Sequence, residues 1–558
     1  MTKKYVIGLD YGTLSGRAVL VDVENGDVVA QHTKAYPHGV METELPDGTR
    51  LPADWALEHP QDFLDVLDEC VLQIMSASGI LPVDVIGIGV DFTASTVLPV
   101  DADGKPLCFE PRFASEPHAW VKLWKHHGAR EQAKRMTELA RENEEDFLAE
   151  YGGVVNAEWG IPKLLETLEK APEVYRAADC FMEAGDWIVR VLTGENVRST
   201  SIAGYKELWR KQEGPLSPDY LGQLHPEFAR LTEEKLKGKL VGLGEKAGYL
   251  TEEMAKRLGL CEGIVVTAAV VDGHVAVPAL GISGPDKAMI VVGTSSCVMT
   301  NSAKKECVPG IFGLVEDGML PGLFGYEAGQ TCVGDMFDWF VKNCVPENYQ
   351  QEARKREMNI HQFLTEKASK LNVGESGLVA LDWWNGNRSC LSDSELTGLI
   401  LGMTLQTKPE EMYRALIEST AYGMRVILDN YEEHGVSIRE IRACGGITKK
   451  NPMMMQIYAD VCNREIMIGT SDQSPALGAA IWSAVAAGTA AGGYDSVETA
   501  AERMGHVEDV VYRPIPENVA AYEKLYREFK LLHDYFGRGE NDVMKRLRRI
   551  KDEAKARQ

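Results

Sequence analysis

The opening of the chain alternates short apolar segments with tight polar turns, which is the pattern of consecutive β-strands. Apolar and β-branched residues dominate residues 4–10, 17–23 and 28–34. Asn25-Gly26 stands between the last two segments and predicts a type I′ hairpin turn. The sequence therefore begins with a predicted β-meander.

The rest of the first half predicts alternating helices and strands. The pattern indicates a helix at 61–76, strands at 83–91 and 95–100, a helical region rich in Trp, Glu and Lys at 119–192, and an apolar strand at 264–271. We expect the region 119–192 to be a helical insertion in an α/β domain. The strand 264–271 ends at Asp272-Gly273.

A second strand-rich unit follows and repeats the opening pattern. Apolar segments 288–292 and 297–300 flank Gly293-Thr294-Ser295-Ser296, just as the first two strands flank Gly12 to Gly16. This weak internal repeat suggests two similar α/β domains facing each other. A cleft between paired domains is a common place for a ligand.

The last part of the chain predicts mostly helices. We expect helices at 409–434 and 452–462 with a strand at 438–444 before the second helix. Residues 473–494 carry no charge and are long enough to span a bilayer, but they are dominated by Ala and Gly and begin next to Pro475. We interpret them as a tightly packed helix of a soluble protein.

Length and composition narrow the function classes. A chain of 558 residues exceeds a single hydrophobic core, so we expect two domains, at 1–282 and 283–558. A net charge of −24 argues against general binding to nucleic acid or to an anionic membrane. The 11 cysteines form no CxxC pair and show no zinc-site spacing. The N-terminus is not followed by the apolar core of a signal peptide. Together with the cysteine pattern, this predicts a cytoplasmic protein.

The first hairpin turn combines groups that suit a nucleotide phosphate. Gly12, Thr13 and Ser15 offer backbone amides and hydroxyls. Asp10 could orient a hydrated Mg²⁺, and Arg17 could neutralise phosphate charge. A Gly/Thr-rich hairpin can also be only a hairpin, so this pattern needs support from elsewhere in the chain.

Support comes from Gly445-Gly446, which stands between a predicted strand and a predicted helix, with Asn451 five residues later. Two glycines let the backbone approach a flat or anionic ligand, and the helix N-terminus adds a favourable dipole. By itself this segment could equally be a turn that enters a helix.

Asp272 is the candidate catalytic carboxylate. It follows directly after an apolar strand, where a strand delivers a side chain into a cleft. An Asp before Gly is also often a turn residue or a helix N-cap, and the residues alone leave the two interpretations even.

Five motifs together resemble the FGGY family of carbohydrate kinases. DYGTLSGRA, IGVDFTAST, VVDGHVA, VVGTSS and CGGITKKN occur in this order from Asp10 to about Ala480. The resemblance implies two ribonuclease H-like domains of the actin-like ATPase type flanking a catalytic cleft, with the insertion in the first. It also implies that the first hairpin and Gly293-Thr294-Ser295 bind ATP phosphates, that Gly445-Gly446 holds adenosine, and that Asp272 deprotonates the sugar hydroxyl.

Within that family, the chain resembles the branch that phosphorylates ketopentoses, L-ribulose in particular. AGYKELW, FGYEAGQ, FTAST and the Trp120/Trp124 pair carry this likeness. It implies a sugar site formed by Ala94, Trp124, Lys206, Asp272 and Glu327, with Asp91 as a secondary member. It further implies ATP with Mg²⁺, a role in L-arabinose catabolism, and a homodimer.

Other interpretations stay open at this point. Trp124 could pack within a helix, Lys206 could be a surface cation, Glu327 a salt-bridge partner and Ala94 a turn filler. The acceptor could be xylulose, ribitol, glycerol or gluconate. An actin- or Hsp70-like ATPase, or a sugar-binding module without catalysis, would share parts of the pattern.

Overall fold

A mixed β-sheet forms the centre of the N-terminal part of the computed structural model, which describes residues 3–555. The chain packs as two units. Unit 1 contains residues up to 284 together with 314–325 and 473–506, and unit 2 contains 285–313, 326–472 and the residues from 507 onward. A division of the chain at 282/283 assigns 314–325 and 473–506 to the second domain, whereas in the structure these segments pack with unit 1.

The main sheet of unit 1 has the order β11-β12-β5-β1-β2-β3, and β13 pairs with β5. Its strands are β1 (Tyr5–Tyr11), β2 (Ser15–Asp22), β3 (Val28–Ala35), β5 (Val85–Phe92), β11 (Lys246–Tyr249), β12 (Val265–Thr267) and β13 (Val270–Val271). Every residue of the central strand β1 is buried, whereas the edge strand β3 alternates exposed and half-buried residues. A strand covered on both faces reads as a continuous apolar run, which is why the sequence shows β1 so clearly.

Smaller strands and most of the helices complete unit 1. A second sheet has the order β4-β7-β6-β8, from β4 (Leu57–Glu58), β7 (Val121–Lys122), β6 (Val97–Val100) and β8 (Cys180–Glu183), and β9 (Val197–Ser199) pairs with β10 (Lys239–Val241). The helices are α1 (Pro60–Ser78), α2 (Arg130–Glu142), α3 (Gly160–Lys170), α4 (Pro172–Ala177), α5 (Ala184–Thr193), α6 (Thr200–Glu207), α7 (Pro218–Leu224), α8 (Leu231–Glu234), α9 (Glu252–Leu258), α10 (Asp272–Ala279), α16 (Ser474–Ala491) and α17 (Val497–Met504). The predicted insertion at 119–192 is therefore helical, but β7 and β8 also lie within it.

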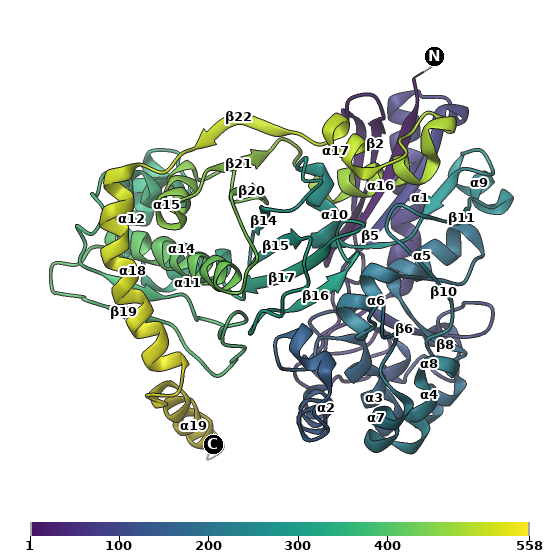
Figure 1. Cartoon of the computed structure of the whole chain (residues 1–558), viewed down its shortest axis with the longest axis horizontal. Coiled ribbons are helices and arrows are strands. Elements are labelled where there is room, and N and C mark those ends of the chain that lie inside the picture. Colours follow the sequence, from purple (N-terminus) through teal and green to yellow (C-terminus); the bar gives the residue numbers. More distant parts are fainter. Residues whose placement is uncertain (1–2, 556–558) are drawn as a thin grey trace. The chain divides into compact units, whose positions relative to one another are not determined.

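The Ala/Gly-rich helix α16 packs directly on the sheet of unit 1. It lies against β1 and β5 and also contacts α10 (Figure 1). The fit is close: a Cβ at Gly8 of β1 would lie 1.9 Å from the carbonyl oxygen of Ala476. Small residues on both elements are what permit this approach, and they explain the unusual composition of residues 473–494. Among the residues 3–555, no helix is long and apolar enough to cross a membrane.

Unit 2 is built around a second mixed sheet. Its strands follow the order β17-β15-β14-β20-β21-β22, with β14 antiparallel to β15 and parallel to β20. The strands of unit 2 are β14 (Lys287–Val292), β15 (Ser296–Ser302), β17 (Phe324–Gln330), β18 (Val379–Leu381), β19 (Leu399–Leu401), β20 (Glu440–Cys444), β21 (Ile466–Gly469) and β22 (Val507–Tyr512), whereas most of β16 (Gly313–Glu316) belongs to a segment of unit 1. The helices of unit 2 are α11 (Gly334–Cys344), α12 (Glu347–Lys355), α13 (Ile360–Ala368), α14 (Pro409–Glu433), α15 (Pro452–Cys462), α18 (Pro516–Gly537) and α19 (Val543–Lys555). The long helix α18 packs beside α15 (Figure 1).

The turn between β2 and β3 differs from the predicted type I′ hairpin. A type I′ turn needs positive φ at both central residues, but Gly26 has a φ of 73° and Asn25 is not among the residues with positive φ. The Gly26 amide instead donates to the carbonyl of Asp22 across a wider turn. The type I′ prediction is therefore wrong, because one left-handed residue is enough to close this longer connection.

Candidate active site

Three carboxylates stand at the carboxyl ends of neighbouring parallel strands in unit 1. The register pairs Asp10 of β1 with Asp91 of β5, and Asp91 in turn with Val270 of β13. Asp272 follows β13 directly and is the first residue of α10. Parallel strands bring their carboxyl ends to one edge of the sheet, and ligands of open α/β sheets bind at that edge. The fold thus gathers residues that lie far apart in the sequence.

Asp10 and Asp91 form a buried acidic pair beside one cation. Their side chains are 3% and 0% exposed, and Arg17 Nη1 lies 3.2 Å from Asp10 Oδ2. Burial raises the pKa of Asp10, and the Arg17 guanidinium opposes that shift. Burial, with the neighbouring carboxylates of Asp10 and Asp272, raises the pKa of Asp91 well above its usual value. No N–H or O–H group of residues 3–555 donates to either carboxylate oxygen of Asp91.

Asp272 is half-buried at the start of α10. Its Oδ1 accepts a hydrogen bond of 2.8 Å from the amide of Gly273. The positive end of the helix dipole favours the ionised carboxylate there. Asp272 is therefore the first residue of α10 and not its N-cap, which is Val271, and the strand register places Asp272 next to the acidic pair.

The first hairpin turn is tight and partly open to solvent. The Gly12 amide donates to Ser15 O at 3.1 Å, and Arg17 Nη2 donates to Ser15 Oγ at 3.2 Å. Leu14 at its tip is 63% exposed. Trp124 donates through its indole Nε1 to Thr13 Oγ1 at 3.1 Å. Hydrogen bonds from Arg17 and Trp124 therefore hold the turn, and its polar groups remain partly exposed.

The remaining predicted sugar residues of unit 1 lie around the same strand ends. Ala94 is 7% exposed in the turn after β5, which is fastened to β1 by a hydrogen bond from Thr93 N to Tyr11 O of 3.1 Å. Lys206 of α6 is 6% exposed, which excludes a surface cation. Its neighbour Tyr205 packs on His274, two residues beyond Asp272, with a ring separation of 4.2 Å. This ring contact links α6 to α10.

Unit 2 also has a tight hairpin turn. The Gly293 amide donates to Ser295 O at 2.9 Å, two residues on, whereas Gly12 in unit 1 donates to Ser15 O, three residues on, so the second turn is one residue tighter. The register of β14 and β20 pairs Val291 with Cys444, so the turns at Gly293 and Gly445 stand at the same edge of the sheet. Gly445 has a φ of 105°, and a Cβ on it would lie 2.4 Å from the carbonyl oxygen of Val292. A Cβ on Gly446 would meet nothing within 4 Å.

Gly334 belongs to this edge and was missed by the sequence reasoning. Its amide donates to Gly293 O at 3.0 Å, and a Cβ on it would lie 2.7 Å from that oxygen and 3.2 Å from Ile447 Cδ1. The N-terminus of α11 therefore rests against the hairpin turn and the turn after β20. The sequence analysis predicted no helix at 334–344, so it gave no signal for this contact.

Two further predicted residues lie in unit 2. Asn451 is the N-cap of α15, and its Oδ1 accepts a hydrogen bond of 3.1 Å from Met454 N. That side-chain oxygen therefore caps the N-terminus of α15. Glu327 lies in β17 and is 8% exposed.

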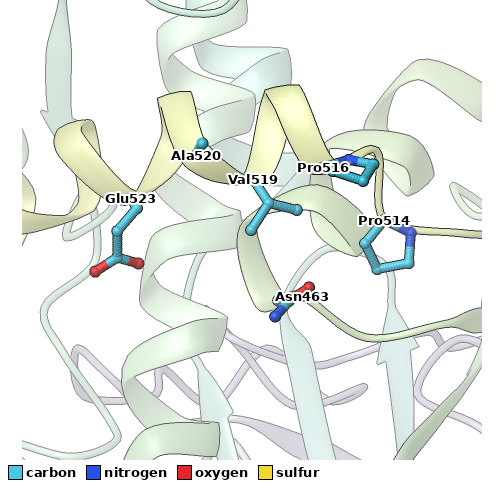
Figure 2. A pocket seen from close by; sticks show the side chains of 6 residues that line it. All are labelled: Asn463, Pro514, Pro516, Val519, Ala520 and Glu523. Atoms are coloured by element: carbon cyan, nitrogen blue, oxygen red, sulfur yellow. The ribbon is translucent and has the colours of Figure 1, made fainter.

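A shallow cavity of about 340 Å³ lies elsewhere in unit 2 (Figure 2). It is formed between the end of α15 and the start of α18 and is lined by Asn463, Pro514, Pro516, Val519, Ala520 and Glu523. Figure 2 shows that the wall is mostly proline, valine and alanine, with Glu523 at one side. None of the predicted site residues lines it.

Models of one protein family match residues in both units. Residues 5–278 match the FGGY family of carbohydrate kinases, N-terminal domain, and residues 288–487 match the C-terminal domain of the same family. The protein named ribulokinase from Geobacillus thermodenitrificans (strain NG80-2) is 52% identical over 557 residues, which cover 100% of this chain and 99% of that protein. The ribulokinase from Halalkalibacterium halodurans is 53% identical over 552 residues, covering 99% and 98%.

Solved structures at lower identity share the fold. A ligand-bound xylulose kinase from Lactobacillus acidophilus has a TM-score of 0.77 at 20% identity, over 95% of this chain and 98% of that one. A gluconate kinase from the same organism has a TM-score of 0.78 at 20% identity, over 96% and 99%. The predicted fold class, two α/β domains of the actin-like ATPase type, is confirmed.

Proposed function

The chain belongs to the FGGY family of carbohydrate kinases, and we propose that it transfers the γ-phosphate of ATP to the terminal hydroxyl of L-ribulose. The product is L-ribulose 5-phosphate, and the reaction serves the use of L-arabinose. The observation that carries this proposal is the full-length likeness, above 50% identity, to proteins named ribulokinase.

Asp272 is the proposed general base. Phosphoryl transfer depends mostly on positioning and electrostatic stabilisation, and the carboxylate has only to accept the acceptor hydroxyl's proton as transfer proceeds. A half-buried side chain at a helix N-terminus is suited to this task, because a carboxylate interacts favourably with the helix dipole and the side chain is not fully enclosed.

The proposed sugar contacts are those that the likeness to ketopentose kinases implies. We propose that Lys206 and Glu327 bind sugar hydroxyls, that Trp124 offers an apolar face to the C–H surface of the sugar, and that Ala94 lines the turn after β5. The burial of Lys206 supports its role, because a lysine with only a surface role would be exposed.

The two hairpin turns are the proposed phosphate-binding elements. Gly12 and Thr13 in unit 1, and Gly293 and Thr294 in unit 2, offer backbone amides and hydroxyls from turns that are each closed by a hydrogen bond from the first glycine. Arg17 adds positive charge next to the first turn. Gly446 is the proposed adenosine contact, since its α-carbon faces open space.

Mg²⁺ fits the acidic pair in unit 1. Carboxylate oxygens are the ligands this ion prefers, and it usually keeps several of its waters. Neither oxygen of Asp91 accepts a hydrogen bond from an N–H or hydroxyl group of residues 3–555, so this buried carboxyl fits a cation or its water shell. We therefore propose that Asp10 and Asp91 hold hydrated Mg²⁺, which when bound neutralises charge on the ATP phosphates.

An acceptor panel tests the proposed function. Purified protein is incubated with Mg·ATP and, separately, L-ribulose, D-ribulose, D-xylulose, ribitol and glycerol, and ADP formation is compared with a sample without acceptor. We expect the highest kcat/KM with L-ribulose and negligible ADP without acceptor. A preference for glycerol or D-xylulose over both ribuloses would contradict the proposed substrate, L-ribulose. ADP formation that no sugar accelerates would overturn the kinase reaction itself.

A further inference from the structure

Two buried side chains of opposite charge hold the turn at residues 93–96 by its main chain. Lys163 Nζ, from α3, donates to Ser95 O at 2.6 Å. Glu183 Oε2, at the end of β8, accepts from Thr96 N at 3.1 Å. The hydroxyls of Thr93 and Thr96 lie 3.0 Å apart within the turn. The carbonyl and the amide of consecutive turn residues are thus each bound by one charged side chain.

This turn needs such support because its backbone is strained. Ser95 has a φ of 63°, in the left-handed region that residues with a Cβ seldom adopt. Conformations of this kind are unfavourable and persist only where the surroundings impose them. Ala94, a proposed sugar contact, is the residue immediately before Ser95. The position of Ala94 therefore depends on the hydrogen bonds from Lys163 and to Glu183 that hold the turn.

Lys163 makes a second hydrogen bond, to the main chain next to Trp124. The same Nζ donates to Leu123 O at 2.8 Å. The next residue is Trp124, whose indole donates to Thr13 in the first hairpin. A single ammonium group therefore ties together the main chain beside Ala94 and the main chain beside Trp124.

Burial alone does not favour a lysine and a glutamate at this place. Lys163 is 0% exposed and Glu183 is 2% exposed. Burial lowers the pKa of Lys163 and raises the pKa of Glu183, so the protein works against the ionised form of each. The two side chains nevertheless do what apolar residues cannot, because only polar groups can bind the turn's carbonyl and amide.

We infer that Lys163 is a positioning residue for the ketopentose, which sets Ala94 and Trp124 in place, with Glu183 as its partner on the same turn. The inference rests on the proposed function, because it takes Ala94 and Trp124 as sugar contacts. Lys163 itself contacts only protein. Its removal should therefore weaken sugar binding more than ATP binding.

The test compares Lys163→Met with Lys235→Met. Lys235 is a matched control, because it is also a buried lysine of unit 1 that donates to a main-chain carbonyl, Ala178 O at 2.6 Å. For Lys163→Met we expect KM for L-ribulose to rise about 10-fold or more while KM for ATP stays within about twofold. Lys235→Met should leave both KM values within about twofold. If KM for L-ribulose rises equally in both variants, or in neither, the inference is wrong.

Glu183 tests the same turn from its other side if Lys163→Met does not fold. Glu183→Gln keeps an oxygen that can accept from Thr96 N, whereas Glu183→Met removes it. We expect KM for L-ribulose to rise with Met and to be largely rescued with Gln, and equal KM values in the two variants would contradict the inference. If the wild-type protein prefers another sugar, the proposed function fails, and KM for that sugar takes the place of KM for L-ribulose in every comparison.

Discussion

The indole Nε1 of Trp124 donates a hydrogen bond of 3.1 Å to Thr13 Oγ1, which joins a proposed sugar contact to a proposed phosphate-binding turn within unit 1. The two residues are 111 positions apart in the sequence. A change at one of the two residues should therefore be felt at the other. The contact also gives Trp124 a fixed orientation, as expected of a side chain that presents its ring to a ligand.

The first prediction concerns this hydrogen bond. Trp124→Phe and Thr13→Val each remove it, so their effects on kcat/KM for L-ribulose should not add in the double variant. A neutral hydrogen bond contributes about 0.5–1.5 kcal/mol, so the coupling should be about 2- to 12-fold in kcat/KM. Steady-state kinetics of the four proteins measures it. Additivity to within about 0.3 kcal/mol would show that the contact has no role in catalysis.

The second prediction separates the two glycines after β20. Gly445→Ala places a Cβ against the carbonyl oxygen of Val292 at a φ of 105°, so it should destabilise the fold by about 1–3 kcal/mol. Gly446→Ala adds a methyl group in open space, so its melting temperature should match that of the wild type, while KM for ATP rises about 10-fold. Thermal unfolding and ATP titrations measure the two effects. An unchanged KM for ATP in Gly446→Ala would show that Gly446 is not part of the nucleotide site.

The third prediction concerns the dependence of stability on pH. Glu58 of β4 is 1% exposed, and neither of its carboxylate oxygens accepts a hydrogen bond from the described residues. Burial, with Asp62 nearby, raises the pKa of Glu58 well above its usual value. Between about pH 4.3 and that raised pKa, the folded protein binds a proton that the unfolded chain releases. The stability contributed by Glu58 is therefore full below about pH 4.3 and is lost as the pH rises.

Glu58→Gln removes this titration while keeping a neutral side chain of the same shape. The melting temperature of the variant, relative to the wild type, should therefore increase from pH 5 to pH 8. Thermal unfolding across that range measures the difference. A gap that stays constant, or that narrows as the pH rises, would mean that Glu58 is ionised in the folded protein.

Much of the fold could be predicted because its main signals are local. The central strand β1 is buried on both faces and reads as an apolar run, and α14 and α15 begin at Pro409 and Pro452, which are favoured at the first helical position. The carboxylates at strand ends, Asp91 and Asp272, were recognisable for the same reason. Each stands directly after an apolar segment.

The rest depends on contacts between distant segments that no local pattern records. Lys163 looks like a surface residue of an amphipathic helix, yet it is fully buried with its ammonium on two carbonyl groups. Gly334 looks like an unfavourable helix start, yet it lets α11 approach Gly293. The packing of residues 473–506 with unit 1 depends on the fit of α16 to Gly8 and Gly89, whose close approach to Ala476 and Ala479 appears only in three dimensions.

The central claim is that Asp272 accepts the proton of a ketopentose hydroxyl during transfer from ATP. The most direct test is the rate of L-ribulose-dependent ADP formation by Asp272→Asn, with ATP affinity measured by calorimetry on the same preparation. General-base catalysis contributes about 10²- to 10⁴-fold, so we predict a fall in kcat of that order with a dissociation constant for ATP within about twofold of the wild type. A variant that keeps kcat within about tenfold of the wild type would contradict the account.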